Sequence, residues 1–139
     1  MRVLALDPGS VRIGVAQSDE LKLLASPLEH IPAEPFAGFL QRFKDLLREK
    51  EVDLVIVGMP RNMDGTYGDA AARVREFVSA LQEAVSVPIR TWDERLTSVQ
   101  ANRVLSQNKT RRDDRRKKVD GIAAAVLLQS YLDMQGLSA

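Results

Sequence analysis

The sequence predicts an α/β protein built on a mixed five-stranded sheet with helices on both faces. Two observations support this class. Short apolar runs typical of strands come first in the chain, and stretches with helical spacing then separate the later runs. A composition of 45% hydrophobic and 28% charged residues is ordinary for a globular chain. Because the 139 residues contain no linker-like stretch, we expect a single domain over residues 1–139.

The first three strands are expected at residues 2–6, 12–18 and 22–29. The first is apolar on both faces, which is typical of a buried strand. Polar residues between the second and third strands favour a hairpin, so the three strands form an antiparallel meander. Pro27 indicates that the third strand lies at an edge, because proline cannot donate a hydrogen bond to a central ladder.

Helices and strands alternate in the remainder of the chain. They are expected in the order 36–50 (helix), 53–58 (strand), 69–85 (helix) and 88–92 (strand). Connection through helices makes these two strands parallel to the first strand and near it. Thr97 and Gln100 form a capping-box pattern that predicts a further helix. An apolar helix over 119–134 closes the chain, and its hydrophobicity nearly all round predicts burial.

Residue types exclude several kinds of site. The chain has no cysteine, so it has neither disulfides nor thiolate metal ligands. Its one histidine, His30, lies among alternating apolar and polar residues, which favours a structural or surface role. The first apolar run is too short for a signal peptide, and no stretch approaches the roughly 18 apolar residues of a membrane span. We therefore expect a cytoplasmic protein without a membrane partner.

Positive charge is concentrated in residues 107–118, QNKTRRDDRRKK. This segment carries seven basic and two acidic side chains, although the net charge of the whole chain is only +1. Such a segment favours a polyanionic partner, and a solvated loop is the alternative. Contacts to backbone phosphates would give affinity with little sequence preference. The candidate contacts are Arg111, Arg112, Arg115, Arg116 and Lys117.

Acidic residues follow the strands that the sheet would place together. The stretch LALDPGSVRIGVA, residues 4–16, puts Asp7 directly after a buried strand. Asp93 and Glu94 follow the last strand, and Asp120 lies near the start of the closing helix. Ligands of open α/β sheets bind beyond the carboxyl ends of the parallel strands, so we expect these carboxylates to converge there.

Converging carboxylates in apolar surroundings would repel one another unless a cation joined them. Oxygen ligands suit Mg²⁺ or Mn²⁺, and two such ions about 4 Å apart can promote phosphodiester cleavage. The predicted ligands are Asp7, Glu94 and Asp120, with Asp93 as the runner-up for the middle ligand. Each acid has a structural alternative: turn hydrogen bonds for Asp7, an ion pair with a nearby arginine for Glu94, and a helix N-terminal position for Asp120.

Four motifs carry a resemblance to a known family. They are D-P-G-S-V-R-I-G-V-A (7–16), G-M-P-R-N-M-D-G-T-Y-G (58–68), D-E-R-L-T-S (93–98) and V-D-G-I-A-A-A (119–125). In this order and spacing, over nearly the whole chain, they resemble the YqgF family, whose members are named as pre-16S rRNA nucleases or Holliday junction resolvases. The resemblance implies a ribonuclease H-like fold related to the RuvC resolvases. It also implies a metal-dependent nuclease whose acids map to Asp7, Glu94 and Asp120.

The expected function is hydrolysis of phosphodiester bonds in structured nucleic acid, most specifically processing of the 5′ end of pre-16S rRNA in ribosome biogenesis. One alternative is a Holliday junction resolvase acting on four-way DNA, which would require a homodimer. Another is a ribosome-assembly factor that binds nucleic acid without cleaving it. An actin-like or sugar-kinase ATPase shares the D-x-G start, but it would need a second lobe for which 139 residues leave no room.

Other motif residues acquire weaker expectations. The loop over 58–68 could bring Arg61 and Asn62 to a phosphate, or it could be a plain connection. Gly14 would permit close backbone approach beside Asp7, or merely a tight sheet contact. Trp92 is expected in the core. The region around Asp120 offers no histidine as a fourth ligand, so the number of metal ions stays open.

Overall fold

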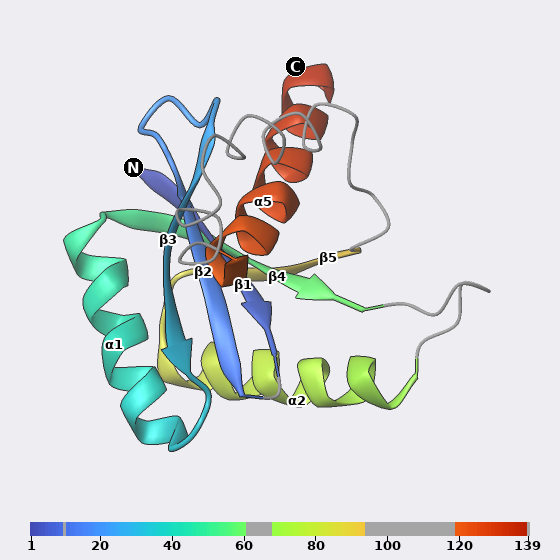
Figure 1. Ribbon diagram of the computed structural model, residues 1–139. Helices are drawn as coiled ribbons and strands as arrows, with labels where there is room; N and C mark the ends of the chain where they lie inside the picture. The colour runs from blue at the N-terminus through green and yellow to red at the C-terminus, as the bar shows by residue number, and fades with distance from the viewer. Residues whose placement is uncertain (10, 61–67, 94–118, 139) are drawn as a thin grey trace.

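The computed structural model describes residues 1–9, 11–60, 68–93 and 119–138, excluding the side chains of residues 119–120 and 136–138 (Figure 1). The strands are β1 (Arg2–Pro8), β2 (Arg12–Ser18), β3 (Ala25–Pro32), β4 (Val52–Met59) and β5 (Ile89–Asp93). The helices are α1 (Phe36–Glu49), α2 (Asp69–Ala84) and α5 (Val119–Ser138). Within these ranges no helix is both long enough and apolar enough to cross a bilayer.

The five strands form one mixed sheet in the order β3-β2-β1-β4-β5. Strands β1, β2 and β3 are antiparallel neighbours, whereas β1, β4 and β5 are parallel. The predicted sheet, its meander and its parallel half are therefore confirmed. Strand β3 lies at an edge, as Pro27 indicated. Helices α1 and α2 cover one face and α5 covers the other, so the prediction of helices on both faces also holds (Figure 1).

Alternation along the strands divides the core into two layers. Leu4 and Leu6 of β1 pack toward α1 and α2, together with buried residues of the other strands. Val3 and Ala5 of the same strand pack toward α5. Successive side chains of a strand point to opposite faces, so β1 is apolar on both and lies at the centre of the sheet. Burial on both faces explains its unbroken apolar sequence.

Hydrogen bonds fix α5 at both sides of the sheet. Gln129 accepts a hydrogen bond from the Ala25 N–H at 2.9 Å and donates one to the Leu23 carbonyl oxygen at 3.0 Å. The indole N–H of Trp92 donates to Ser130 Oγ at 3.3 Å, and its ring lies edge-on to Tyr131. Trp92 is thus a packed side chain, as expected from the sequence. Buried polar groups are satisfied in this way where α5 meets the edges of the sheet.

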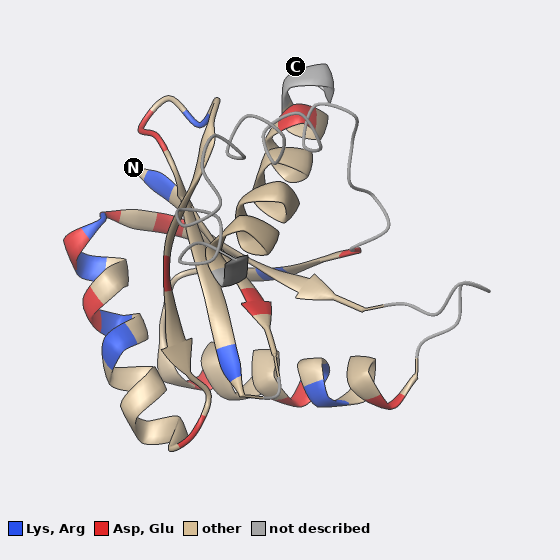
Figure 2. Ribbon diagram, viewed as in Figure 1, with Lys and Arg blue, Asp and Glu red and all other residues tan. Residues whose placement is uncertain are grey.

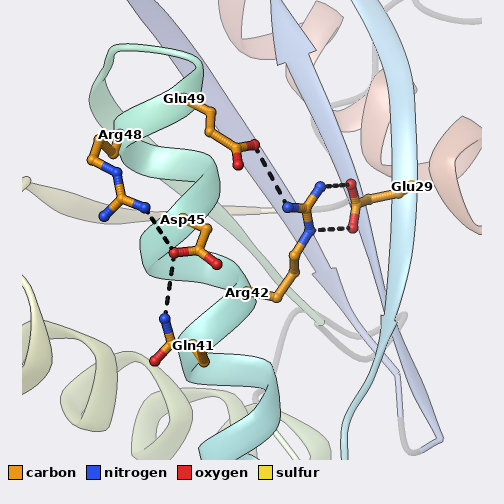
Figure 3. A network of polar contacts seen from close by, with 6 residues as sticks. All are labelled: Glu29, Gln41, Arg42, Asp45, Arg48 and Glu49. Atoms are coloured by element: carbon orange, nitrogen blue, oxygen red, sulfur yellow. Dashed lines mark hydrogen bonds and ion pairs between the residues drawn. The ribbon is translucent and has the colours of Figure 1, made fainter.

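A charged network joins α1 to the edge strand β3 (Figure 3). The Arg42 guanidinium donates two hydrogen bonds to the Glu29 carboxylate, at 2.9 and 2.7 Å, and lies 3.5 Å from Glu49. The hydrogen bonds to Glu29 raise the pKa of the Arg42 guanidinium, as expected for a charge-assisted, bidentate pair. Figure 2 shows that charged residues of both signs line α1, whereas the described part of α5 is almost uncharged.

Several strand boundaries differ from the sequence prediction by one to three residues, and two of these shifts have a local cause. The third strand begins at Ala25 rather than at residue 22, because Asp19 Oδ1 accepts hydrogen bonds from the Leu23 and Leu24 N–H groups and Lys22 adopts φ 58°. These contacts extend the turn. The first strand runs to Pro8 rather than residue 6, because its pairing with β2 continues. The helix predicted from Thr97 lies outside the described residues.

Gly121 permits the closest approach of α5 to the sheet. A Cβ atom at this position would lie 2.9 Å from Pro27 Cβ, whereas a Cβ at Gly38 of α1 would meet Pro35 Cγ at an ordinary 3.7 Å. We expect Gly121→Ala to lower the free energy of unfolding by about 1 kcal/mol or more through overpacking. Gly38→Ala is the matched control and should raise it by up to about 1 kcal/mol through helix propensity.

Urea denaturation of both variants measures these changes. Equal effects of the two substitutions would contradict the assigned contact between α5 and β3.

Candidate active site

Asp7 occupies the carboxyl end of the central strand. It is the penultimate residue of β1 and is partly buried. Because Val3 and Ala5 face α5, alternation places Asp7 on the same face of the sheet. The sequence predicted Asp7 just after the strand, whereas it lies within the ladder, opposite Gly14 of β2. The charge at the end of the apolar run thus lies at the sheet edge where open α/β folds bind ligands.

Glycines flank Asp7 in both neighbouring strands. Gly14 of β2 pairs with Asp7, and it also pairs with His30 of β3. On the other side, Leu6 pairs with Val57 of β4, and the next position along β4 is Gly58. Neither neighbour has a side chain to occupy the space beside the carboxylate. An ion or a phosphate group at Asp7 would therefore meet no side chain from these two positions.

The first turn of α5 lies at this edge of the sheet (Figure 1). Gly121 lies against Pro27 and Leu28 of β3, and Gln129 lies near the start of that strand. Since β3 runs from Ala25 to Pro32, α5 points its N-terminus toward the carboxyl end of β1. Asp120 is the second residue of α5, so its backbone belongs to this turn. An acidic residue there is favoured by the helix dipole.

Asp93 lies on the other face of the sheet. It pairs with Met59 of β4, and Met59 belongs to the core layer beneath α1 and α2. The preceding residue, Trp92, packs in the layer beneath α5. The alternation of β5 therefore sets Asp93 on the face opposite to Asp7. Glu94, the predicted middle ligand, lies outside the described residues.

Several other predicted contacts also lie outside the described residues. They are Arg61, Asn62, Arg111, Arg112, Arg115, Arg116 and Lys117. Among the side chains that are described, no three His, Asp or Glu converge in a metal-binding group. His30 is exposed on the edge strand, which agrees with its expected surface role. Of the three preferred metal ligands, Asp7 alone has a described side chain; the runner-up, Asp93, is described as well.

The residues at this edge fit a hard divalent cation. Asp7 supplies carboxylate oxygens, and its two cross-strand neighbours are glycines. Asp120 is the second residue of α5, whose N-terminus points toward this edge of the sheet. The chain has no cysteine to favour a softer metal. This donor chemistry suits Mg²⁺ or Mn²⁺.

The arrangement of strands and helices is that of the ribonuclease H-like fold. The structure matches Thermus thermophilus RuvC in complex with a Holliday junction substrate, with a TM-score of 0.59 and 18% identity over 96% of each chain. It also matches the fowlpox virus resolvase in complex with Holliday junction DNA, with a TM-score of 0.58 and 15% identity over 97% of this chain and 99% of that one. Likeness at these identities establishes the fold alone.

Sequence comparison defines the family. The chain belongs to the RuvX family, whose model, described as Holliday junction resolvase, matches residues 1–134. The motifs had indicated this family under the name YqgF, so the resemblance is confirmed.

Three relatives that align over nearly their whole length carry the same name. A protein of Symbiobacterium thermophilum is 46% identical over 96% of this chain and 92% of its own length. A protein of Geobacillus kaustophilus is 45% identical over 96% of this chain and 98% of its own length. A protein of Halothermothrix orenii is 42% identical over 97% of this chain and 96% of its own length. Each of the three is named "Putative pre-16S rRNA nuclease".

Proposed function

We propose that this protein is a metal-dependent nuclease that hydrolyses phosphodiester bonds in structured nucleic acid. The observation that carries the proposal is the position of Asp7, a partly buried carboxylate at the carboxyl end of the central strand with glycine on both sides. Membership of the RuvX family and the names of the relatives support nuclease chemistry at this edge. The start of α5, which carries Asp120, lies at the same edge.

The proposed metal ligands are Asp7, Glu94 and Asp120. We prefer Glu94 to Asp93 because Asp93 shares a face with the core layer beneath α2. Mg²⁺ or Mn²⁺ bound by these acids would supply Lewis-acid activation of a water molecule and neutralise charge at the phosphate. The protein's own part is to position the carboxylates and to keep side chains out of the two positions that flank Asp7.

The proposed nucleic-acid contacts lie in two segments. Arg61 and Asn62 follow strand β4, whose carboxyl end is adjacent to that of β1. The basic segment precedes Asp120, so a phosphate backbone held by Arg111, Arg112, Arg115, Arg116 and Lys117 would pass close to the acids. Such contacts supply affinity and orientation rather than sequence recognition.

The favoured substrate is the 5′ end of pre-16S rRNA, and the proposed setting is ribosome biogenesis. The names of the relatives support this choice. The description of the family model supports a second candidate, resolution of four-way DNA junctions. Symmetric resolution requires two active sites and hence a homodimer. Cleavage of labelled rRNA precursor and DNA junctions side by side, with sedimentation to measure the oligomeric state, separates these candidates.

Replacement of Asp7 tests the proposed centre. Asp7→Asn keeps the size of the side chain and removes the charge that would hold the cation. We expect cleavage of labelled RNA in Mg²⁺ or Mn²⁺ to fall by more than about 100-fold. Circular dichroism and the melting temperature control for folding. Full activity of a folded Asp7→Asn protein would refute the assignment.

The adjacent acids Asp93 and Glu94 provide a matched pair. Glu94→Gln should reduce cleavage about as strongly as Asp7→Asn, because a proposed ligand is lost. Asp93→Asn should retain at least about a tenth of the activity, because Asp93 faces the other side of the sheet. Initial rates at several Mn²⁺ concentrations measure both effects. The reverse pattern would make Asp93 the ligand.

The basic segment is tested by the salt dependence of binding. Arg115→Gln with Arg116→Gln removes two proposed phosphate contacts. The slope of log K against log salt should become shallower by about 1.5. Lys44→Gln with Arg48→Gln removes two exposed charges from α1 and is the matched control. Binding is measured by fluorescence anisotropy in EDTA, and equal slopes for both double variants would exclude the segment from the interface.

A further inference from the structure

A cavity of about 520 Å³ opens beside the candidate active site, on the face covered by α1 and α2. Its lining includes the end of β1, the segment before α1 and the first turns of α2. Residues from these segments include Pro8, Gly9, Glu34, Phe36, Arg73 and Phe77. Pro8 and Gly9 directly follow Asp7, and consecutive Cα atoms are only about 3.8 Å apart. Because Asp7 faces α5, a nucleic-acid strand bound at Asp7 would reach this cavity by crossing the carboxyl edge of β1 at Pro8 and Gly9.

Two aromatic side chains, Phe36 and Phe77, form part of the cavity wall. All four phenylalanines of the chain form one cluster, in which Phe39 and Phe43 are fully buried. Phe36 is 36% exposed and Phe77 is partly buried, with ring centroids 6.4 Å apart at an interplanar angle of 81°. Both rings line the cavity. An aromatic ring exposed in this way offers a stacking surface for a nucleobase.

Two exposed charges of opposite sign complete the lining. Glu34 precedes α1, and Arg73 lies in the second turn of α2. A carboxylate accepts hydrogen bonds from N–H groups, whereas a guanidinium donates them to paired acceptors. Guanine presents both patterns: N1–H and the 2-amino group on its Watson–Crick edge, and O6 with N7 on the other edge. Adenine, cytosine and uracil each lack one of these two patterns.

We propose that this cavity is a guanine-preferring base subsite for an unpaired nucleotide next to the cleaved bond. The base would stack on the exposed Phe36 ring and meet Phe77 at its edge, with Glu34 and Arg73 contacting its polar edges. The inference rests on the proposed nuclease function, since that function brings nucleic acid to Asp7. It extends that function by giving the enzyme a sequence preference that phosphate contacts do not supply.

The test is a nuclear magnetic resonance titration of the ¹⁵N-labelled full chain with 5′-GMP, 5′-AMP, 5′-CMP and 5′-UMP in EDTA. GMP should shift the amide signals of Gly9, Ala33 and Ala70, which line the cavity. The other three nucleotides should bind at least about tenfold more weakly. Arg73→Gln and Glu34→Gln should each weaken GMP binding about tenfold, and Phe36→Leu should weaken all four nucleotides.

Arg75→Gln is the matched control, because Arg75 lies on the same helix but does not line the cavity. It should leave GMP binding unchanged. Equal affinity for the four nucleotides, signals that shift elsewhere, or GMP binding that survives Arg73→Gln would overturn the proposal. Without a divalent ion no cleavage is measured, so this outcome is independent of the result for Asp7→Asn.

Discussion

The close packing of α5 on the sheet is the contact on which the candidate site depends. Small residues make it possible: Gly121 lies against Pro27, while Ala124 and Ala125 share the core layer of Val3, Ala5 and Ala16. Because both surfaces lack bulk, the helix start lies at the carboxyl edge of the sheet, where β1 ends with Asp7. The packing that stabilises this core layer thus also sets the direction of the first turn of α5, to which the backbone of Asp120 belongs.

The end of β1 separates two chemically different surfaces. On the α5 face, Asp7 lies between glycines, and its carboxylate suits a divalent cation that would bind a phosphate group of the nucleic acid. On the other face, Pro8 and Gly9 border a cavity whose lining includes two aromatic rings. The turn after β1 requires glycine at position 9, because a Cβ atom there would lie 2.5 Å from the Arg12 carbonyl oxygen. One short turn therefore positions both surfaces within reach of a single bound strand.

The sequence predicted those features of the fold that depend on neighbouring residues in the chain. The apolar runs, Pro27 and the helical spacing gave the order and direction of the strands, and Asp7 followed from its position after the first run. The start of β3 depended on side-chain hydrogen bonds from Asp19, which the pattern of apolar residues does not contain. The sequence alone could not predict which face of the sheet Asp93 occupies, because this depends on the register of β5 against β4. The cavity arises where two helices distant in sequence meet, so no local pattern in the sequence indicates that Phe36 and Phe77 line it together.

The central claim is that Asp7 holds a hard cation at this edge of the sheet. Paramagnetic broadening by Mn²⁺ in ¹⁵N-correlated spectra measures it most directly, because the ion broadens only the amide signals near it. In the wild-type protein we expect selective broadening of Gly14 and Gly58, the neighbours of Asp7, and its loss in Asp7→Asn. Broadening that centres on another part of the fold, or that persists unchanged in Asp7→Asn, would contradict the account.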